Sequence, residues 1–129
     1  MNIPQELRYT KTHEWVRKEG NKAVVGISDY AQKEISDVVF VETPKVGQNA
    51  EAGKPLAVVE SVKAAFDIYA PVSGQVTKVN TQLEGDPGVV NAECYGEGWF
   101  FEIEMTDTAA WDQLMSAEEY EKVLKAEAH

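Results

Sequence analysis

The chain has 129 residues, and its 43% hydrophobic content with three tryptophans is enough for one folded domain with an ordinary core. The formal net charge of −10 repels nucleic-acid phosphates and anionic lipid, and the 12 basic residues form no run, which argues against nucleic acid and membrane surfaces as partners. No signal peptide and no span of the ~20 apolar residues that a bilayer needs is recognisable. We therefore expect a single cytoplasmic domain covering residues 1–129.

The first predicted elements are a hairpin and a short helix. Residues 9–17 and 23–27 are strand-like, and the polar segment 18–22 supplies the turn between them. Ser28 or Asp29 is expected to cap the helix that follows.

Further strands follow along the chain. Residues 37–42 are predicted as the clearest buried strand, because β-branched and aromatic residues run together there. Segments 56–59 and 66–69 predict two more strands. Residues 99–105 alternate, with Trp99, Phe101, Ile103 and Met105 expected on the core face and Glu102 and Glu104 on a wet face.

The C-terminal segment changes to a helical period. Ser116 and Glu119 have the spacing of a capping box, and Tyr120, Val123 and Leu124 form an apolar stripe. This helix is expected to cover a β-rich core and to carry no functional group. The terminal residue, His129, is expected to be mobile.

A weak internal repeat links two parts of the chain. The pattern of residues 44–48 returns at 71–75, 27 residues later. Two similar strand–turn units favour a pseudo-two-fold sandwich or flattened barrel, which closes exposed sheet edges. A chance recurrence of Pro and Gly in turns is the alternative.

Enzyme motifs are not found. Cys94 is the sole cysteine and lies far from both histidines in the sequence, so a structural role is expected. Residues 96–98 precede a strand and therefore do not form a dinucleotide-binding loop, and no P-loop, zinc spacing or nucleophile elbow occurs. We expect no catalytic residue and no metal ligand.

A lysine lies where a turn-forming residue is the simpler choice. If strands 56–59 and 66–69 pair as a hairpin, Val62 and Lys63 fall at its tip. Tight two-residue turns favour Gly, Asn or Asp with positive φ, so a broader turn is expected here. A residue that breaks a local rule suggests function, although a solvated lysine at a loop tip is the plain alternative.

The segment Glu60-Ser61-Val62-Lys63-Ala64 resembles a lipoyl-attachment site. Gly47 lies 16 residues before Lys63 and Gly74 lies 11 after it, a spacing typical of lipoyl domains. Biotin carriers flank their lysine with methionines, and Val62 and Ala64 stand at those positions here. Four more stretches, residues 12–15, 26–32, 38–42 and 95–99, extend the resemblance over nearly the whole chain, which is similar to the H-protein family of the glycine cleavage system.

The resemblance implies a mainly β, lipoyl/biotinyl-like barrel-sandwich hybrid with short flanking helices and a C-terminal helix. It implies covalent attachment of lipoic acid to Lys63 as N6-lipoyl-lysine, so that the redox sulfurs come from the cofactor. The residues implied in recognition by the lipoylating enzyme are Glu60, Ser61, Val62, Ala64, Gly47 and Gly74.

The same resemblance implies a non-catalytic, monomeric shuttle. Its arm takes an aminomethyl group from a pyridoxal-phosphate glycine decarboxylase to a folate-dependent aminomethyltransferase and then delivers dihydrolipoamide to its dehydrogenase. A lipoate ligase or octanoyltransferase is the implied modifying partner. Other hypotheses remain: a lipoyl donor for other complexes, an unmodified β-sandwich adaptor in which Lys63 is merely exposed, and a small hydrolase.

A cleft for the loaded arm is also implied by the family. The matching positions are Thr12, Glu14 and Asp67. Glu14 and Asp67 have a simpler interpretation as solvated faces of edge strands. His13 is expected to be a packed histidine, since no partner acid is visible in the sequence.

Overall fold

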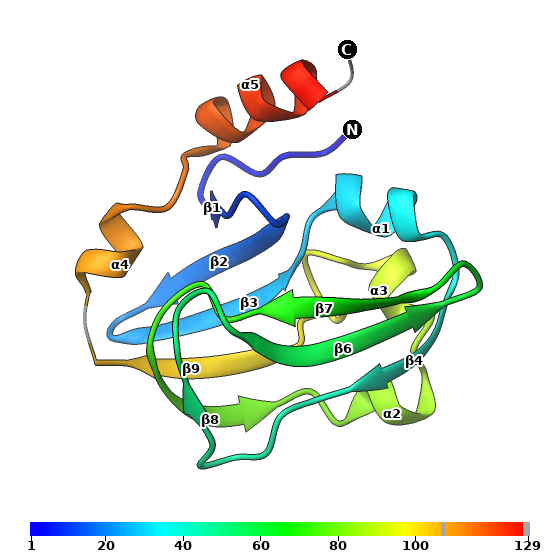
Figure 1. Cartoon of the computed structure of the whole chain (residues 1–129), viewed down its shortest axis with the longest axis horizontal. Helices are drawn as coiled ribbons and strands as arrows, with labels where there is room; N and C mark the ends of the chain where they lie inside the picture. Colours follow the sequence, from blue (N-terminus) through cyan, green and yellow to red (C-terminus); the bar gives the residue numbers. More distant parts are fainter. Residues whose placement is uncertain (107, 128–129) are drawn as a thin grey trace.

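The protein, described here from a computed structural model that covers residues 1–106 and 108–127, is built from two antiparallel sheets that face each other across the core (Figure 1). The six-stranded sheet has the order β1-β2-β3-β9-β8-β5. Its strands are β1 (Arg8–Tyr9), β2 (Glu14–Glu19), β3 (Lys22–Ile27), β9 (Phe101–Met105), β8 (Gly74–Val79) and β5 (Asn49–Ala50). The three-stranded sheet has the order β4-β6-β7, with β4 (Val38–Glu42), β6 (Pro55–Ser61) and β7 (Ala65–Tyr69). His129 lies outside the described residues.

Short helices connect and flank the sheets. They are α1 (Asp29–Ile35), α2 (Gln82–Gly85), α3 (Val89–Ala92), α4 (Ala109–Asp112) and α5 (Ala117–Glu127). Helix α1 begins after Ser28, whose hydroxyl oxygen accepts the Ala31 N–H at 3.2 Å, so Ser28 is the cap of the two predicted candidates. None of the helices in the described part of the chain is long and apolar enough to cross a membrane.

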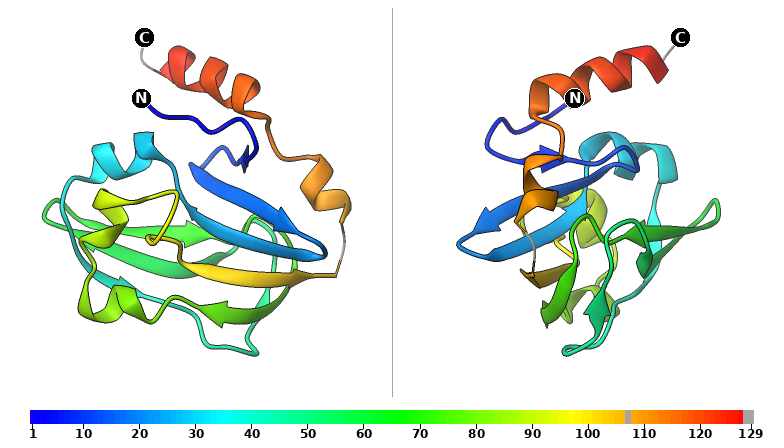
Figure 2. Two further views of the ribbon diagram at one scale, coloured as in Figure 1. Left: turned by 180° about the vertical axis from the view of Figure 1, so that it is seen from behind. Right: turned by 60° about the vertical axis from the view of Figure 1, so that its left-hand side comes forward.

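The C-terminal helix lies outside the sandwich, beside β1 and the N-terminal segment (Figure 2). The predicted capping box is confirmed: the Ser116 N–H donates to the Glu119 carboxylate at 2.9 Å, and the Glu119 N–H donates to the Ser116 hydroxyl at 3.2 Å. Tyr120 and Leu124 are buried, and the Tyr120 ring stacks on Tyr9 with centroids 4.6 Å apart. Packing of this apolar stripe fixes α5 on the outer side of the six-stranded sheet.

The two copies of the repeat are neighbours in space. Strands β5 and β8 pair antiparallel, and the Gly47 N–H donates to the Val76 carbonyl at 2.8 Å. Gly47 has φ +92°, a backbone conformation that favours glycine. At Gly74 a Cβ atom would stand 1.9 Å from the Glu104 carbonyl oxygen, so only glycine fits there. Both glycines therefore allow the two turns to pack closely against the sheet.

Two sequence expectations about burial are wrong. In β4 only Val38 and Val41 are buried, whereas Val39 and Phe40 are 55% and 47% exposed. The reason is that Phe40 lies on the outer face of the sheet with Glu60, and that the register shift between Val38 and Phe40 interrupts the alternation at Val39. Glu102, expected in water, is only 6% exposed, because the Thr77 hydroxyl donates to its carboxylate at 2.8 Å and Lys22 Nζ lies 3.8 Å from it.

Candidate functional site

Lys63 lies in the turn between β6 and β7. The tip of this hairpin protrudes from the body of the protein (Figure 1). The strands pair as far as Glu60 and Ala65, and the turn between them is closed by a bond from the Ser61 N–H to the Ala64 carbonyl at 2.9 Å. The Ser61 hydroxyl accepts the Lys63 N–H at 3.1 Å. None of the four described turn residues, 61–64, has a positive φ, which agrees with the broader turn expected for Val and Lys.

The Lys63 side chain is exposed, and its ammonium reaches helix α1. Nζ donates to the Glu34 carbonyl at 2.9 Å, in the last turn of that helix. A second bond, from the Val62 N–H to the Asp37 carbonyl at 3.0 Å, anchors the turn to the segment that enters β4. The backbone of the tip is thus held in place by hydrogen bonds, and it carries a long side chain that ends in an accessible amine.

The outer face of the three-stranded sheet combines acidic and apolar side chains next to this tip. Cross-strand partners share a face, and the register places Phe40 beside Glu60 and Glu42 beside Val58. Val58 in turn pairs with Asp67, so three carboxylates lie on this face. Val62, at the tip itself, is 66% exposed. The exposed apolar residues of β4 were missed by the sequence analysis, because a β-branched run looks the same at an edge as in a core.

The other predicted recognition residues are placed differently. Ser61 is buried and holds the turn from inside through its hydroxyl. Gly74 begins β8, five residues after the end of β7, and therefore lies near the open end of the hairpin. A strand as long as β7 spans about 17 Å at ~3.3 Å per residue. Gly74 is therefore separated from the tip of the hairpin by about the length of this strand. Gly47 contacts the same strand β8.

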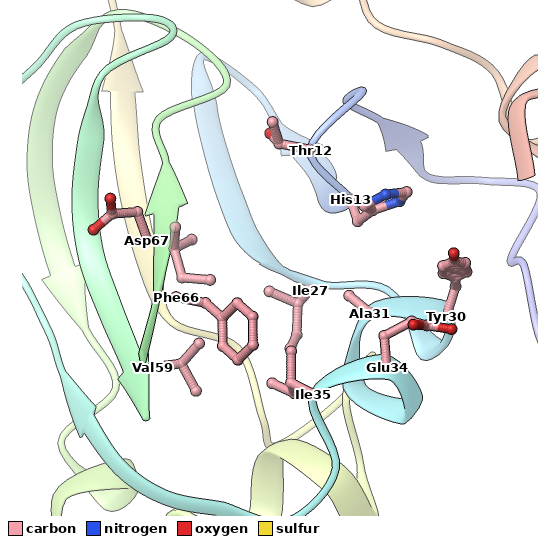
Figure 3. Close-up of a pocket in the computed structure, with 11 residues that line it drawn as sticks. Thr12, His13, Ile27, Tyr30, Ala31, Glu34, Ile35, Val59, Phe66 and Asp67 are labelled. Atoms are coloured by element: carbon pink, nitrogen blue, oxygen red, sulfur yellow. The ribbon is translucent and has the colours of Figure 1, made fainter. Parts of the chain in front are cut away.

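A pocket of about 290 Å³ opens between helix α1 and the hairpin (Figure 3). Its lining residues are Thr12, His13, Ile27, Tyr30, Ala31, Glu34, Ile35, Val59, Phe66, Asp67 and Ile68. In Figure 3 the side chains of Ile27, Ile35 and Phe66 point toward one another and form an apolar floor. Tyr30 and Glu34 come from one face of α1, since they are four residues apart. That helical spacing is the signal by which the sequence analysis could have found them.

The three residues predicted for the cleft occupy three different positions. Thr12 lines the pocket. Asp67 belongs to the wall, but its carboxylate points away from the Phe66 ring, to the outer face of β7 (Figure 3). Glu14 is only 1% exposed and is not among the lining residues. The interpretation of Glu14 as a solvated strand face is therefore wrong.

Glu14 supports the pocket wall from behind. Its carboxylate accepts the hydroxyls of Thr10 and Thr12, and it accepts the Tyr69 N–H at 3.2 Å. A buried carboxylate is tolerated when its oxygens are hydrogen-bonded in this way. Through these bonds Glu14 connects the Thr12 segment to the end of β7.

His13 joins the pocket to the C-terminal helix. It has φ +75°, and its ring stacks on Tyr30 with centroids 4.9 Å apart. Nδ1 lies 2.8 Å from the Tyr120 hydroxyl, and Nε2 lies 3.5 Å from the Glu127 carboxylate. The sequence analysis found no partner acid for His13, because both partners on α5 are more than a hundred residues away along the chain.

Cys94 has the structural role expected. It is buried, and burial, followed by the charge of Asp29, raises the pKa of its thiol to about 12. Its carbonyl accepts the Trp15 indole N–H at 2.8 Å. A thiol in this state is a poor nucleophile at neutral pH.

A comparison with protein families decides the family of the chain. The family model described as "Glycine cleavage H-protein" matches residues 7–127. The chain belongs to the glycine cleavage H-protein family. Among curated members, an H protein of Thermus thermophilus is 52% identical over 99% of this chain and 100% of its own length. The H protein of Rubrobacter xylanophilus is 53% identical over 97% of each chain.

A solved structure of the family has the same fold. The crystal structure of an H protein from Mycobacterium marinum superposes with a TM-score of 0.85 at 36% identity, covering 93% of this chain and 97% of the other. The predicted lipoyl-type barrel-sandwich fold is thereby confirmed. Glycine cleavage H proteins are non-catalytic subunits that carry a lipoyl group covalently on a lysine, so this chain is a lipoyl carrier of the glycine cleavage system.

Proposed function

We propose that the lipoyl group is attached to Nζ of Lys63 and that residues 1–129 form a single carrier domain. The observation that carries the proposal is the placement of Lys63: an exposed amine on a fixed turn, beside a pocket with an apolar floor. The residues present fit the group, because the amine faces open solvent where a ligase can reach it. Acylation removes the positive charge of the lysine.

The cofactor supplies the dithiolane sulfurs for thiol and disulfide chemistry. The chain's own sulfur cannot replace them, because Cys94, its only cysteine, is buried and has a raised pKa. What the protein contributes is position, a high effective concentration at each partner and a place that excludes water.

The partners of the shuttle follow from this role. We propose that it moves between a pyridoxal-phosphate glycine decarboxylase, a folate-dependent aminomethyltransferase and dihydrolipoamide dehydrogenase, as a cytoplasmic monomer. A lipoate ligase or octanoyltransferase modifies Lys63. The carboxylates of Glu42, Glu60 and Asp67 around exposed Phe40 suit partners with a basic rim and an apolar centre.

Recognition at the tip divides into two roles. Glu60, Val62 and Ala64 are exposed and available to direct contact, whereas Ser61 acts by holding the turn. Gly47 and Gly74 lie away from the tip and act indirectly. They allow the turns that position strands of the six-stranded sheet, against which the hairpin packs.

The pocket beside the hairpin is proposed to hold the loaded arm. Its floor is apolar, and Thr12, fixed by Glu14, offers a hydroxyl at the wall. Glu34 at the wall adds negative charge that favours an amine-bearing cargo, and the outward carboxylate of Asp67 adds negative charge on the outer face of β7. Seating the cargo against this floor slows hydrolysis by reducing its contact with water.

The test is the intact mass of the protein isolated from lipoate-sufficient cells. We expect a lipoyl- or octanoyl-sized addition that maps to Lys63 and is absent from Lys63→Arg, which keeps its fold and supports no glycine decarboxylation. Lys54→Arg is the matched control, because Lys54 is also exposed but lies at the opposite end of β6. A bare Lys63 in the wild type, or normal glycine turnover by Lys63→Arg, would leave only the adaptor hypothesis.

A further inference from the structure

The Tyr120 hydroxyl joins three elements that the chain brings together only in the folded state. It lies 2.7 Å from the Ser28 hydroxyl, which caps α1, and 2.8 Å from Nδ1 of His13 at the pocket. Tyr120 itself is fully buried, on the inner face of α5. No water can therefore replace its hydrogen bonds without repacking.

The N-cap is compatible with one continuous direction for these hydrogen bonds. In it the Ser28 oxygen accepts the Ala31 N–H and donates its own proton to the Tyr120 oxygen. The Tyr120 proton then points to Nδ1 of His13, which leaves the proton of the neutral imidazole on Nε2, toward Glu127. Burial raises the pKa of Tyr120, so its hydroxyl keeps the proton that this chain of bonds requires.

We propose that Tyr120 is a positioning residue of the arm pocket: it fixes the His13 imidazole against Tyr30 and ties the start of α1, one wall of the pocket, to α5. This inference rests on the proposed use of the pocket. His13 needs such a partner, because its φ of +75° is an uncommon conformation for a residue other than glycine. Its ring stacks at 12° on Tyr30, and both residues line the pocket.

The pocket contacts of His13 and Tyr30 are thus set by a helix that contributes no lining residue. Loss of the Tyr120 hydroxyl leaves Nδ1 without its donor, so the imidazole is free to rotate and to exchange between its two tautomers. It also removes the hydrogen bond between Tyr120 and the Ser28 hydroxyl, which caps the N-terminus of α1. Both changes loosen the side of the pocket opposite the hairpin, and water reaches the cargo more easily.

The experiment compares Tyr120→Phe with Tyr9→Phe in the lipoylated protein. The control is matched, since Tyr9 is equally buried and stacks on Tyr120, but its hydroxyl donates to the Pro4 carbonyl and not to the pocket. The readouts are the hydrolytic lifetime of the aminomethyl-loaded protein and the ¹⁵N chemical shifts of the His13 imidazole. Thermal unfolding of both variants reports the purely structural effect.

We expect Tyr120→Phe to shorten the loaded lifetime about fivefold, which corresponds to about 1 kcal/mol or one neutral hydrogen bond, and to shift the His13 ¹⁵N signals. Tyr9→Phe should lower the thermal stability by a similar amount but should change neither the loaded lifetime nor the His13 ¹⁵N signals. Equal lifetimes in the two variants, with unmoved His13 signals, would overturn the inference. If Tyr120→Phe does not fold, the ¹⁵N shifts of the wild-type protein decide: a His13 imidazole whose Nδ1 accepts no hydrogen bond overturns the inference too.

The proposed function fails in a different way. A wild-type loaded lifetime equal to that of a free aminomethyl-dihydrolipoamide would show that the pocket gives no protection, and the role of Tyr120 would fall with it. A protected wild type with an unaffected Tyr120→Phe variant refutes only the positioning role.

Discussion

Glu14 offers the sharpest test of how the pocket wall is built. It is buried, and it is hydrogen-bonded to Thr10, Thr12 and the backbone of Tyr69. Asp67, the other predicted cleft acid, is exposed on the outer face of β7. We therefore expect the two carboxylates to differ strongly in their contribution to stability.

The magnitude for Glu14→Ala follows from what the side chain does. The Tyr69 N–H loses a charged acceptor, at a cost of about 1.5–3 kcal/mol. One buried methylene adds about 0.8 kcal/mol. The threonine hydroxyls can turn toward water, because Thr12 is exposed, and relief of the buried charge offsets part of the loss. The expected decrease in unfolding free energy is about 2–3 kcal/mol.

The assay is urea unfolding followed by circular dichroism, with Asp67→Ala as the control. The control should lie within about 0.5 kcal/mol of wild type, as for other surface substitutions. If Glu14→Ala and Asp67→Ala prove equally mild, Glu14 does not support the wall. Glu14→Gln keeps the shape and should cost about 1 kcal/mol. Combined with Asp67→Ala it should speed hydrolysis of the loaded arm, and an unchanged lifetime would remove both residues from the protection of the cargo.

Gly74→Ala should destabilise by about 3 kcal/mol, because its Cβ would collide with the Glu104 carbonyl; unfolding that matches wild type would contradict the close approach. Cys94 in the native protein should react with iodoacetamide at pH 8 about a thousandfold more slowly than in the urea-unfolded chain, since burial raises the pKa of its thiol from 9.0 to about 12; comparable rates would refute its burial. Ser116→Ala should cost about 1 kcal/mol and raise the pKa of Glu119, which bonds to Ser116 hold below its ordinary value. A carboxyl group whose pKa is lowered by folding stabilises the folded state at pH values above its ordinary pKa, and this stabilisation is lost as the pH falls. The advantage of the wild type in unfolding free energy should therefore shrink below about pH 4.

Parts of the fold were accessible from local sequence because their causes are local. The β6–β7 hairpin with Lys63 at its tip and the Ser116 capping box each depend on residues a few positions apart. The attachment segment 60–64 is contiguous, so its resemblance to a lipoyl site needed no tertiary information. A signal of this kind survives whatever the rest of the chain does.

Burial was where local patterns gave the wrong answer. Strand β4 forms where residues 37–42 predict one, but Phe40 lies on the outer face of the sheet beside Glu60, and the register shift between Val38 and Phe40 leaves Val39 exposed as well. The alternation in residues 99–105 predicts that Glu102 is exposed, but its side chain is buried, because Thr77 and Lys22 contact it from the strands on either side. Whether a side chain is wet depends on neighbours that periodicity does not reveal.

The sequence by itself determined the chemistry that this protein presents: an amine at a turn, flanked by a recognisable motif, and no usable sulfur of its own. Only the tertiary structure decided the surroundings of that amine, including the buried role of Glu14, the outward direction of Asp67 and the contact of His13 with Tyr120. The physical reason is distance along the chain. The hydrogen bonds that join Tyr69 to Glu14 and His13 to Tyr120 form only after the two sheets and the C-terminal helix have packed together.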